Sequence, residues 1–453
     1  MRRSAAHDSV ARISGLLALA CLGAIGCGPT GEPDQTAADS QADDQPFISD
    51  SSSFRQIAVG ASHTCALTWR GEAWCWGSNG YGQLGIGSAD HQAHRSAERA
   101  APHLVLQSIA AGRAHTCGLD TAGAAWCWGH NENGQIGAEG PDAQCRTPDG
   151  TEPCRPAPAR VGGGRSFVAI AVGSTFSCGL DGAGTAWCWG GNRFQQHSVL
   201  GTRDPGTCSE TVAGEGGGEE ASFPCGARSP VQVAGAPRLV AIRSGWTHSC
   251  GLGADGSAYC WGSNQHGELG SGGAGRIDGA VRVAGAPALV SVEPGSRHTC
   301  GLARDGAIWC WGSNESGALG VDSTAESCAS DSGGGAPLRR VPCALRPVRV
   351  QSTTYFRFLE TGPLLSCALD RDGAAHCWPS RDARGNLTGR RPEPYAMGRP
   401  LVSISTGYVT CGLDRNGIAV CRGWNDGGQL GAGLTTRHSD TAVVVVRSSA
   451  PSP

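Results

Sequence analysis

Seven pairs of cysteines divide this chain into seven similar units. The two members of every pair stand ten residues apart. The pairs are Cys65 with Cys75, Cys117 with Cys127, Cys178 with Cys188, Cys250 with Cys260, Cys300 with Cys310, Cys367 with Cys377, and Cys411 with Cys421. Each pair encloses a small or polar strand, a turn centred on glycine and a tryptophan-rich strand; the first copy reads HTCALTWRGEAWCWG. A cysteine pattern locked to a repeat predicts one supersecondary unit copied seven times, with one cross-link per copy.

The spacing within a pair fits a cross-strand disulfide in a hairpin. If Cys65 and Cys75 oppose each other on antiparallel strands, the hairpin centres on Arg70 and Gly71 follows. This arrangement is typical of a type I turn followed by a left-handed glycine. Opposed residues of such strands lie close enough for a disulfide, which would stabilise each unit by about 2.5–3 kcal/mol. Zinc is the alternative ligand, but zinc sites favour cysteines separated by about two to four residues, so we expect disulfides and no metal.

The remaining cysteines also divide evenly. Of 22 cysteines, Cys21 and Cys27 lie near the N-terminus. The other six form local pairs inside the three longest insertions between units: Cys145 with Cys154, Cys208 with Cys225, and Cys328 with Cys343. An even, locally paired count predicts a disulfide framework formed in an oxidising compartment.

The N-terminal segment is typical of an export signal. Arg2, Arg3 and Arg12 precede the apolar run 13–27, which ends at Cys27 and is too short to span a bilayer. The sequence AIGC resembles the lipobox of bacterial lipoproteins, which makes 1–26 a signal peptide and Cys27 the lipidated residue; Cys21, in ALAC, is the alternative, and a plain secretory signal is a second one. Gly28 favours sorting to the outer membrane. The acidic segment 27–53 has little to bury and is expected to be a disordered tether.

Residues 54–453 carry the repeats, and each repeat shows four strand-like pieces. The first is apolar and ends in glycine, the second holds the first cysteine, the third holds the tryptophans, and the fourth is a short outer strand such as AVRV. Four short strands cannot bury both faces of their sheet alone, whereas a closed ring of sheets can. We therefore predict an all-β, seven-bladed β-propeller with tryptophans of one blade packed on the leucine and disulfide of its neighbour. An open solenoid is the alternative, but it would need polar end caps.

The segment after each tryptophan strand resembles a known family signature. WGSNGYGQLG, WGHNENGQIG, WGSNQHGELG and WGSNESGALG, together with the upstream GxxHTCxL, are similar to the regulator of chromosome condensation repeat. The resemblance implies a seven-bladed propeller, in agreement with the seven copies. Copies three, six and seven depart from the signature, with WGGNRFQQHSVLG, Trp378-Pro379 and Arg422, so we expect those blades to be less regular at that corner.

Composition and motifs argue against several functions. The formal net charge of −3 offers no basic footprint for nucleic acid. We find no nucleophile elbow, zinc-protease motif or phosphate-binding loop, and therefore expect no enzyme activity and no cofactor. Histidines recur three residues after the strand-ending glycine, at His63, His115, His248 and His298. A ring that binds a metal or an anion is one interpretation, and hydrogen bonding to backbone where blades meet is the favoured one.

The insertions suggest where a partner binds. They span 138–160, 202–228 and 321–346, at one point of the repeat, so they should project from a common face. We expect a non-enzymatic, monomeric envelope lipoprotein that binds a protein or glycan there and meets the membrane through its lipid alone; neutral drift is the alternative for the insertions. A second hypothesis is a protein inhibitor of a periplasmic or secreted enzyme, similar to propeller-type inhibitors of β-lactamase. Nucleotide exchange, the namesake activity of the family, is disfavoured by the oxidising compartment.

Overall fold

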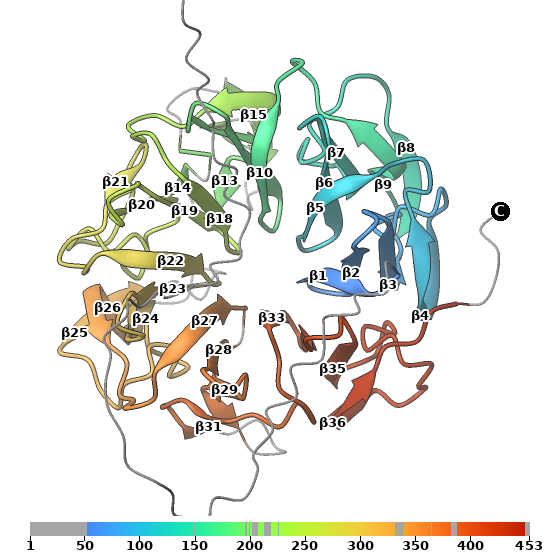
Figure 1. Cartoon of the computed structure of the whole chain (residues 1–453). Helices are drawn as coiled ribbons and strands as arrows, with labels where there is room; N and C mark the ends of the chain where they lie inside the picture. Colours follow the sequence, from blue (N-terminus) through green and yellow to red (C-terminus); the bar gives the residue numbers. More distant parts are fainter. Residues whose placement is uncertain are drawn as a thin grey trace, which may run out of the picture. The chain divides into compact units, whose positions relative to one another are not determined.

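The fold is a ring of seven antiparallel sheets around a central axis (Figure 1). The computed structural model describes residues 52–147, 150–194, 197–198, 200–201, 207–212, 219–224, 226–330, 339–363, 365–381 and 387–448. These residues lie within one compact unit, Phe47–Pro453. The prediction of an all-β, seven-bladed propeller is confirmed. Among the described residues, no helix has the length and apolar character needed to cross a membrane.

Each blade is built from four strands of one repeat, which are given below in their order outward from the axis; in blades two, three, five and six, strands of an insertion lie between the third and the fourth along the chain. Blades one and two contain β1 (Phe54–Val59), β2 (His63–Thr68), β3 (Ala73–Asn79) and β4 (Asp90–Ala100), then β5 (Leu106–Ala111), β6 (His115–Asp120), β7 (Ala125–His130) and β9 (Gly150–Arg160). Blades three and four contain β10 (Phe167–Val172), β11 (Phe176–Asp181), β12 (Ala186–Gly190) and β17 (Ala227–Gln232), then β18 (Ala241–Ser244), β19 (His248–Leu252), β20 (Ala258–Gly262) and β21 (Val281–Arg282).

The last three blades follow the same order. Blade five contains β22 (Leu289–Pro294), β23 (His298–Ala303), β24 (Ile308–Ser313) and β26 (Arg339–Arg349). Blade six contains β27 (Phe356–Thr361), β28 (Ser366–Asp370), β29 (Ala375–Trp378) and β32 (Glu393–Pro394). Blade seven contains β33 (Ser403–Thr406), β34 (Val409–Leu413), β35 (Ala419–Trp424) and β36 (His438–Val444).

The second and third strands of every blade form the predicted disulfide hairpin. Cys65 lies directly opposite Cys75, with 4.1 Å between their Cα atoms, and the two are bonded. Gly71 turns the chain with a φ of 80°, in the left-handed region that glycine adopts without strain. The other six blades repeat the opposed cysteines and their bond, which joins Cys117 to Cys127, Cys178 to Cys188, Cys250 to Cys260, Cys300 to Cys310, Cys367 to Cys377, and Cys411 to Cys421. The expectation of one cross-strand disulfide per blade is therefore confirmed.

Tryptophans fill most of the interfaces between blades. Trp128 of blade two is fully buried and packs on blade one, in a cluster with the Cys65–Cys75 disulfide and Leu67. Its indole Nε1 donates to the carbonyl oxygen of Gln83, 2.9 Å away. Trp76 makes the corresponding contact with blade seven and donates to Gln429 O at 2.8 Å. The predicted packing of tryptophan on the neighbouring leucine and disulfide is thus confirmed.

The signature after the tryptophan strand is explained by this packing. Gly85 lies under Trp128, because a Cβ added to Gly85 would come within 2.6 Å of the indole Nε1. Asn79 folds the same loop by accepting the backbone N–H of Leu84 on its Oδ1 atom. Gln83 supports the loop by accepting the N–H of Tyr81 on its side-chain oxygen. The WGxN and QLG pieces therefore form one loop that seats the next blade.

The departures predicted for copies three and six are visible at this corner. The prediction is wrong for copy seven, whose loop is regular: Asn425 accepts the N–H of Leu430 and Gln429 accepts that of Gly427. Blade three inserts a short hairpin, β13 (Arg193–Phe194) with β14 (His197–Ser198). Blade six has a cis Trp378-Pro379 bond, a small β30 (Ser380–Arg381) and β31 (Leu387–Gly389) pair, and a two-residue fourth strand. In blade seven Arg422 replaces the tryptophan, and its guanidinium lies 4.3 Å from the ring centroid of Tyr395.

The ring closes between blades seven and one by backbone contacts as well as by packing. The segment after β36 runs beside β4, where Ala97 N donates to Val446 O and Ser448 N donates to Ala97 O, both at 2.8 Å. At the start of β1, Phe54 N donates to the carbonyl oxygen of Gly417, in the turn between β34 and β35 of blade seven. The first blade is completed by its own four strands, so closure needs no strand exchanged from the far end of the chain.

Candidate functional site

One face of the propeller carries both the inner loops and the insertions. Because neighbouring strands within a blade are antiparallel, the connection from the first to the second strand emerges on the same side as that from the third to the fourth. Hydrogen bonds join the two connections, as from Ser78 N to Ser62 O and from His130 N to Ala114 O. We call this side the insertion face. The predicted insertion sites therefore share a face with the mouth of the central channel.

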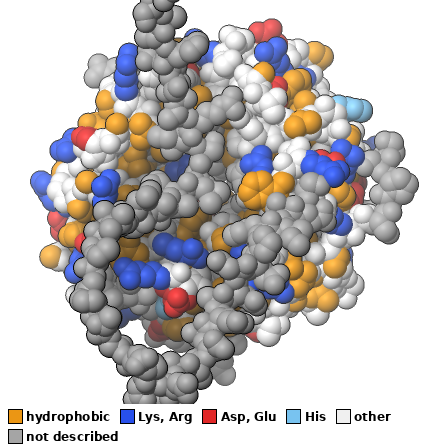
Figure 2. All heavy atoms as spheres, viewed as in Figure 1, with side chains coloured by type: hydrophobic (Ala, Val, Ile, Leu, Met, Phe, Trp, Pro, Cys, Tyr) orange, Lys and Arg blue, Asp and Glu red, His pale blue; other side chains and the backbone are white. Residues whose placement is uncertain are grey.

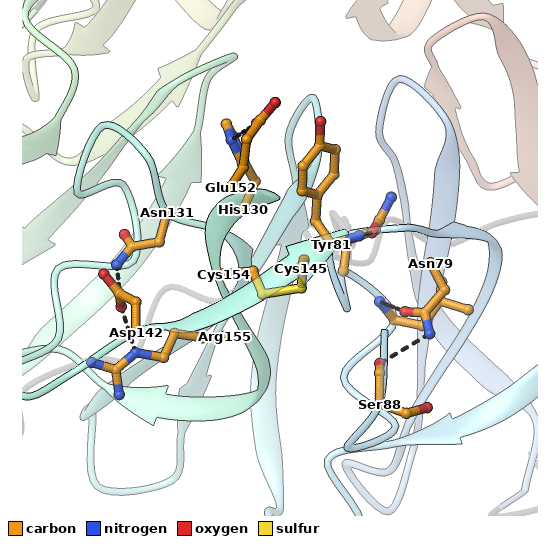
Figure 3. The surroundings of a disulfide bond; sticks show 12 residues. Asn79, Tyr81, Ser88, His130, Asn131, Asp142, Cys145, Glu152, Cys154 and Arg155 are labelled. Carbon is orange, nitrogen blue, oxygen red and sulfur yellow. Dashed lines mark hydrogen bonds and ion pairs between the residues drawn. A yellow bond between two sulfur atoms is a disulfide. The ribbon is translucent and has the colours of Figure 1, made fainter. Parts of the chain in front are cut away.

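The insertion of blade two forms a stapled hairpin at the edge of its blade. The long strand β9 pairs with β7 through its second half and with β8 (Ala143–Thr147) through its first half. A disulfide joins Cys145 to Cys154 across this hairpin, with 5.9 Å between the Cα atoms. Figure 3 shows the disulfide among the polar side chains that surround it. The hairpin thus extends the sheet of the blade instead of hanging from it as a free loop.

A cluster of three side chains fixes this hairpin to the two blades beneath it. His130, at the end of β7, donates from Nε2 to a carboxylate oxygen of Glu152 at 2.7 Å. The ring of Tyr81, from the loop of blade one, lies 4.5 Å from the His130 ring centroid (Figure 3). Burial and the nearby Glu152 carboxylate both raise the pKa of Tyr81. We call Tyr81, His130 and Glu152 the clasp.

The clasp superficially resembles a metal site, but its hydrogen bonds oppose that role. His130, Glu132 and Glu152 bring three ligand atoms within 4.8 Å of one another. Gln135, however, uses its side-chain oxygen to accept the N–H of Asn133, which turns its amide NH₂ toward His130 Nδ1 at 2.9 Å. His130 Nδ1 is therefore an acceptor, and the proton resides on Nε2. A metal ion binds an imidazole lone pair, and Nε2 has none to offer in this tautomer.

A second group of polar contacts anchors the base of the same hairpin. Asp142 accepts from Asn131 and from Arg155 Nε, both at 2.7 Å (Figure 3). Its other carboxylate oxygen lies 3.4 Å from Arg228 on the fourth strand of blade three. The hairpin is consequently fixed to blades on both sides. Held this way, it loses little conformational entropy when a partner binds.

Blade five carries a hairpin of the same design. β25 (Glu326–Ser330) pairs with the first half of β26, and a disulfide joins Cys328 to Cys343 with 5.8 Å between the Cα atoms. The base of the hairpin packs on the preceding blade, where Gly272 N donates to Leu345 O at 2.9 Å.

Blade three also inserts a hairpin, β15 (Thr207–Val212) with β16 (Glu219–Pro224). The expected bond between Cys208 and Cys225 lies outside the described residues, as does Cys27.

The recurrent histidines act between blades, as expected, but their partners are side-chain hydroxyls of the next blade and not the backbone groups that were predicted. His63 Nε2 lies 2.8 Å from the hydroxyl of Thr116 in the next blade, and that hydroxyl donates onward to Gln83 O. The hydroxyl must therefore accept from the imidazole. Burial lowers the pKa of all four histidines, to about 4 for His63 and His248 and about 3 for His115 and His298. They are neutral hydrogen-bond donors at pH 7.

The clasp and the Asp142 anchor were not found by sequence reasoning. The available signal was the second signature copy, WGHNENGQIG, in which His130 stands where three other copies have serine. The distribution of charged residues does not point to the clasp or to the Asp142 anchor either. In the view of Figure 2, arginines are dispersed among apolar side chains and form no single patch.

Comparison with known proteins agrees with this architecture. The chain is 29% identical over 223 residues to the human E3 ubiquitin-protein ligase HERC2, covering 48% of this chain and 4% of HERC2. It is 26% identical over 218 residues to the ultraviolet-B receptor UVR8 of Arabidopsis thaliana, covering 48% of this chain and 43% of UVR8. The chain therefore spans less than half the length of either relative.

Solved structures show the same fold at low identity. Yeast RCC1 (Prp20), solved bound to Kap60, superposes with a TM-score of 0.60 at 20% identity, covering 78% of each chain. Human WBSCR16 superposes with a TM-score of 0.65 at 16% identity, covering 83% of this chain and 94% of its own. The family model of the RCC1-like domain matches residues 19–328, well over half of the sequence. With seven blades and the matching signature loops, the chain belongs to the RCC1-like domain family.

Proposed function

We propose that this protein is an exported, non-enzymatic binding propeller that holds a protein or glycan partner on its insertion face. The observation that carries the proposal is the pair of stapled hairpins on blades two and five. Each is covalently closed and also bonded to a neighbouring blade. Rigid protrusions on a rigid scaffold suit binding because little ordering remains to be done when the partner arrives.

A loop exchange within the molecule gives the sharpest test. Blade four connects its third and fourth strands without a cysteine hairpin, so residues 271–282 supply a short native connection. Replacing 138–160 with this segment removes the blade-two hairpin and retains the following valine, since Val161 and Val283 occupy equivalent buried positions. The same segment can replace 321–349 in blade five, where Val350 is the equivalent residue.

The test compares partner recovery by the parent and the two exchanged proteins from the envelope and secreted fractions of the source cells. We expect a partner recovered by the parent to be lost from at least one exchanged protein, with unchanged thermal unfolding. Trp69→Ser, on the opposite face, is the control because Trp69 is 51% exposed and lies in the turn between β2 and β3. Equal recovery by all proteins would refute binding through the insertion face.

The lipid anchor is a separate part of the proposal and rests on the sequence AIGC alone. Metabolic labelling with a fatty-acid analogue, followed by fractionation of the membranes, tests it. We expect the parent to carry label in the outer membrane and Cys27→Ala to lose both label and membrane association. Undiminished label in that variant would move the lipidated residue elsewhere, with Cys21→Ala as the next variant.

A further inference from the structure

The wall of the central channel is chemically one-sided. The residue two positions before the strand-ending glycine lies on the innermost strand of every blade. Blades one to three place alanine there, and blade seven places Ser405. Blades four, five and six instead carry Arg243, Glu293 and Glu360, in that order around the ring. A wall of small residues is thus interrupted by an arc with one positive and two negative groups.

The arc borders a cavity at the channel mouth on the insertion face. The cavity measures about 110 Å³ and is lined by the ends of the innermost strands and the following loops of all seven blades. Glu360 and Trp246 are among its lining residues. Trp246 of blade four reaches Tyr408 of blade seven in an edge-to-face contact, with ring centroids 6.4 Å apart. Since these blades are not neighbours, the two aromatic rings meet across the mouth of the channel.

The charges of the arc are incompletely paired. Arg243 Nε lies 3.4 Å from a carboxylate oxygen of Glu293, which is 6% exposed. Within the described residues, no hydrogen bond or ion pair satisfies Glu360. Burial raises the pKa of Glu293 to about 7, although Arg243 opposes this shift. Burial and the neighbouring Glu293 raise the pKa of Glu360 well above its ordinary value.

An independent observation shows an unused acceptor on the same wall. Thr406 is 5% exposed and lines the cavity, and its hydroxyl oxygen has no hydrogen-bond partner among the described residues. The hydroxyl faces Gly362, another lining residue, because a Cβ added to Gly362 would come within 2.7 Å of it. Buried polar atoms without a partner are rare in proteins. The wall therefore offers an unpaired carboxylate and an unpaired hydroxyl within a site bordered by aromatic rings.

We propose that the axial cavity binds an organic cation, an ammonium or guanidinium group, with its charge on Glu360 and its apolar part against Trp246. Several N–H donors on one small cation match the acceptors of the wall, and aromatic faces stabilise a desolvated cation. A divalent metal fits less well, since no described group of three metal-ligating atoms lies at this cavity. The cation has two sources, a free small molecule or an Arg or Lys side chain of a bound protein.

Isothermal titration of the full propeller with methylguanidinium tests the site, with methylurea as the neutral ligand of similar shape. We expect saturable binding of methylguanidinium and none of methylurea. Glu360→Gln keeps the size of the side chain and should weaken binding at least tenfold. Glu132→Gln is the matched control, because Glu132 is a 60% exposed acid of the signature loop in blade two. It should bind like the parent.

A second arm separates the two sources of the cation. The peptide Gly-Arg-Gly is compared with the same peptide carrying citrulline, which removes the charge and keeps the shape. Preference for the arginine peptide over free methylguanidinium would identify a protein side chain as the occupant, and the reverse preference a free small molecule. Either result supports the site. Equal binding of charged and neutral ligands, or equal binding by Glu360→Gln and the parent, would overturn it, as would no saturable binding of any cation.

Proton release provides a readout that a structural role would not produce. The ionisable groups around Glu360 are Glu293 on β22, Arg243 on β18, His298 on β23 and Asp370 at the far end of β28, while β33 has none. Arg113 of blade two also lines the cavity. A bound cation stabilises the charged carboxylates, so binding should release protons near pH 7 and strengthen as pH rises from 6 to 8. Titration in two buffers of different ionisation enthalpy measures the release. Binding of methylguanidinium without proton release would contradict Glu360 as its counter-ion.

The Glu360→Gln variant should fold at least as stably as the parent, because it removes the repulsion between Glu360 and Glu293.

Discussion

The interface between blades one and two and that between blades six and seven solve the same packing problem differently. In the first, Trp128 covers the Cys65–Cys75 disulfide and donates a hydrogen bond to the preceding blade. In the second, no tryptophan joins the cluster around the Cys367–Cys377 disulfide, which is covered by residues such as Met397 and Val420. Arg422 stands in the tryptophan position and lies over Tyr395 instead.

The two interfaces also differ in their polar contacts. His63 bridges blades one and two, whereas Leu365 holds the equivalent position in blade six. The interface of blades six and seven therefore lacks both the large buried ring and the buried imidazole. The ring of blades tolerates this substitution because the strand pairing and the disulfide within each blade are unchanged. Strand pairing and the disulfide thus build each blade, whereas the tryptophan and the histidine stabilise the interface between two blades.

Removing the indole of Trp128 from the interface between blades one and two should have the largest effect on the free energy of unfolding. We expect Trp128→Ala to lower the free energy of unfolding by about 3–5 kcal/mol, because a fully buried indole and its hydrogen bond are lost. Denaturant unfolding with intact disulfides measures this. Trp424→Ala is the control, since Trp424 is 50% exposed, and it should change stability little. Similar losses in both variants would show that the buried tryptophan does not dominate the interface.

The second-largest loss of stability is expected when the disulfide of blade one or that of blade six is removed. The Cys65→Ala/Cys75→Ala and Cys367→Ala/Cys377→Ala proteins open loops of equal length, so each should lose about 2.5–3 kcal/mol through the entropy of the unfolded chain. We expect the larger loss in blade one, because its disulfide also packs against Trp128. Parallel denaturant titrations decide the order, and a larger loss in blade six would reverse the proposed difference.

Acid should weaken the histidine-bearing interfaces first. The folded pKa values of about 3 to 4 lie below the ordinary value of 6.5, so the unfolded chain takes up protons first as pH falls. The contribution of these histidines to stability is complete above pH 6.5 and declines toward pH 4, by about 1–2 kcal/mol per histidine at pH 5. His115→Phe, which copies Phe176 of blade three, should reduce the proton uptake on unfolding by about one. An unchanged pH dependence in that variant would contradict the assignment.

The smallest effect is expected at Arg422. Arg422→Ala should cost about 1 kcal/mol or less, because the side chain is partly exposed and its main contact is the stacking on Tyr395. The same denaturant assay applies, with Trp128→Ala as the reference. A loss as large as that of Trp128→Ala would mean that the arginine is a full replacement for the tryptophan.

Much of the fold could be predicted from local sequence. The pairing of Cys65 with Cys75 follows from a ten-residue spacing around one glycine turn, and seven such turns count the blades. The clasp could not be predicted in this way. Tyr81, His130 and Glu152 belong to a loop, a strand and an insertion, and no periodic pattern relates them. The axial site was missed for the same reason, since Glu293 and Glu360 stand 67 positions apart in an otherwise small-residue layer.

The sequence by itself determined the repeat number, the disulfide within each blade and the signature of the loop after each tryptophan strand, because these depend on residues a few positions apart. The tertiary structure decided which side chains meet between blades. Ring closure brings Trp246 of blade four to Tyr408 of blade seven, and the packing of blades four and five brings Arg243 to Glu293. Such contacts depend on the rotation from one blade to the next, which is set by packing over the whole ring.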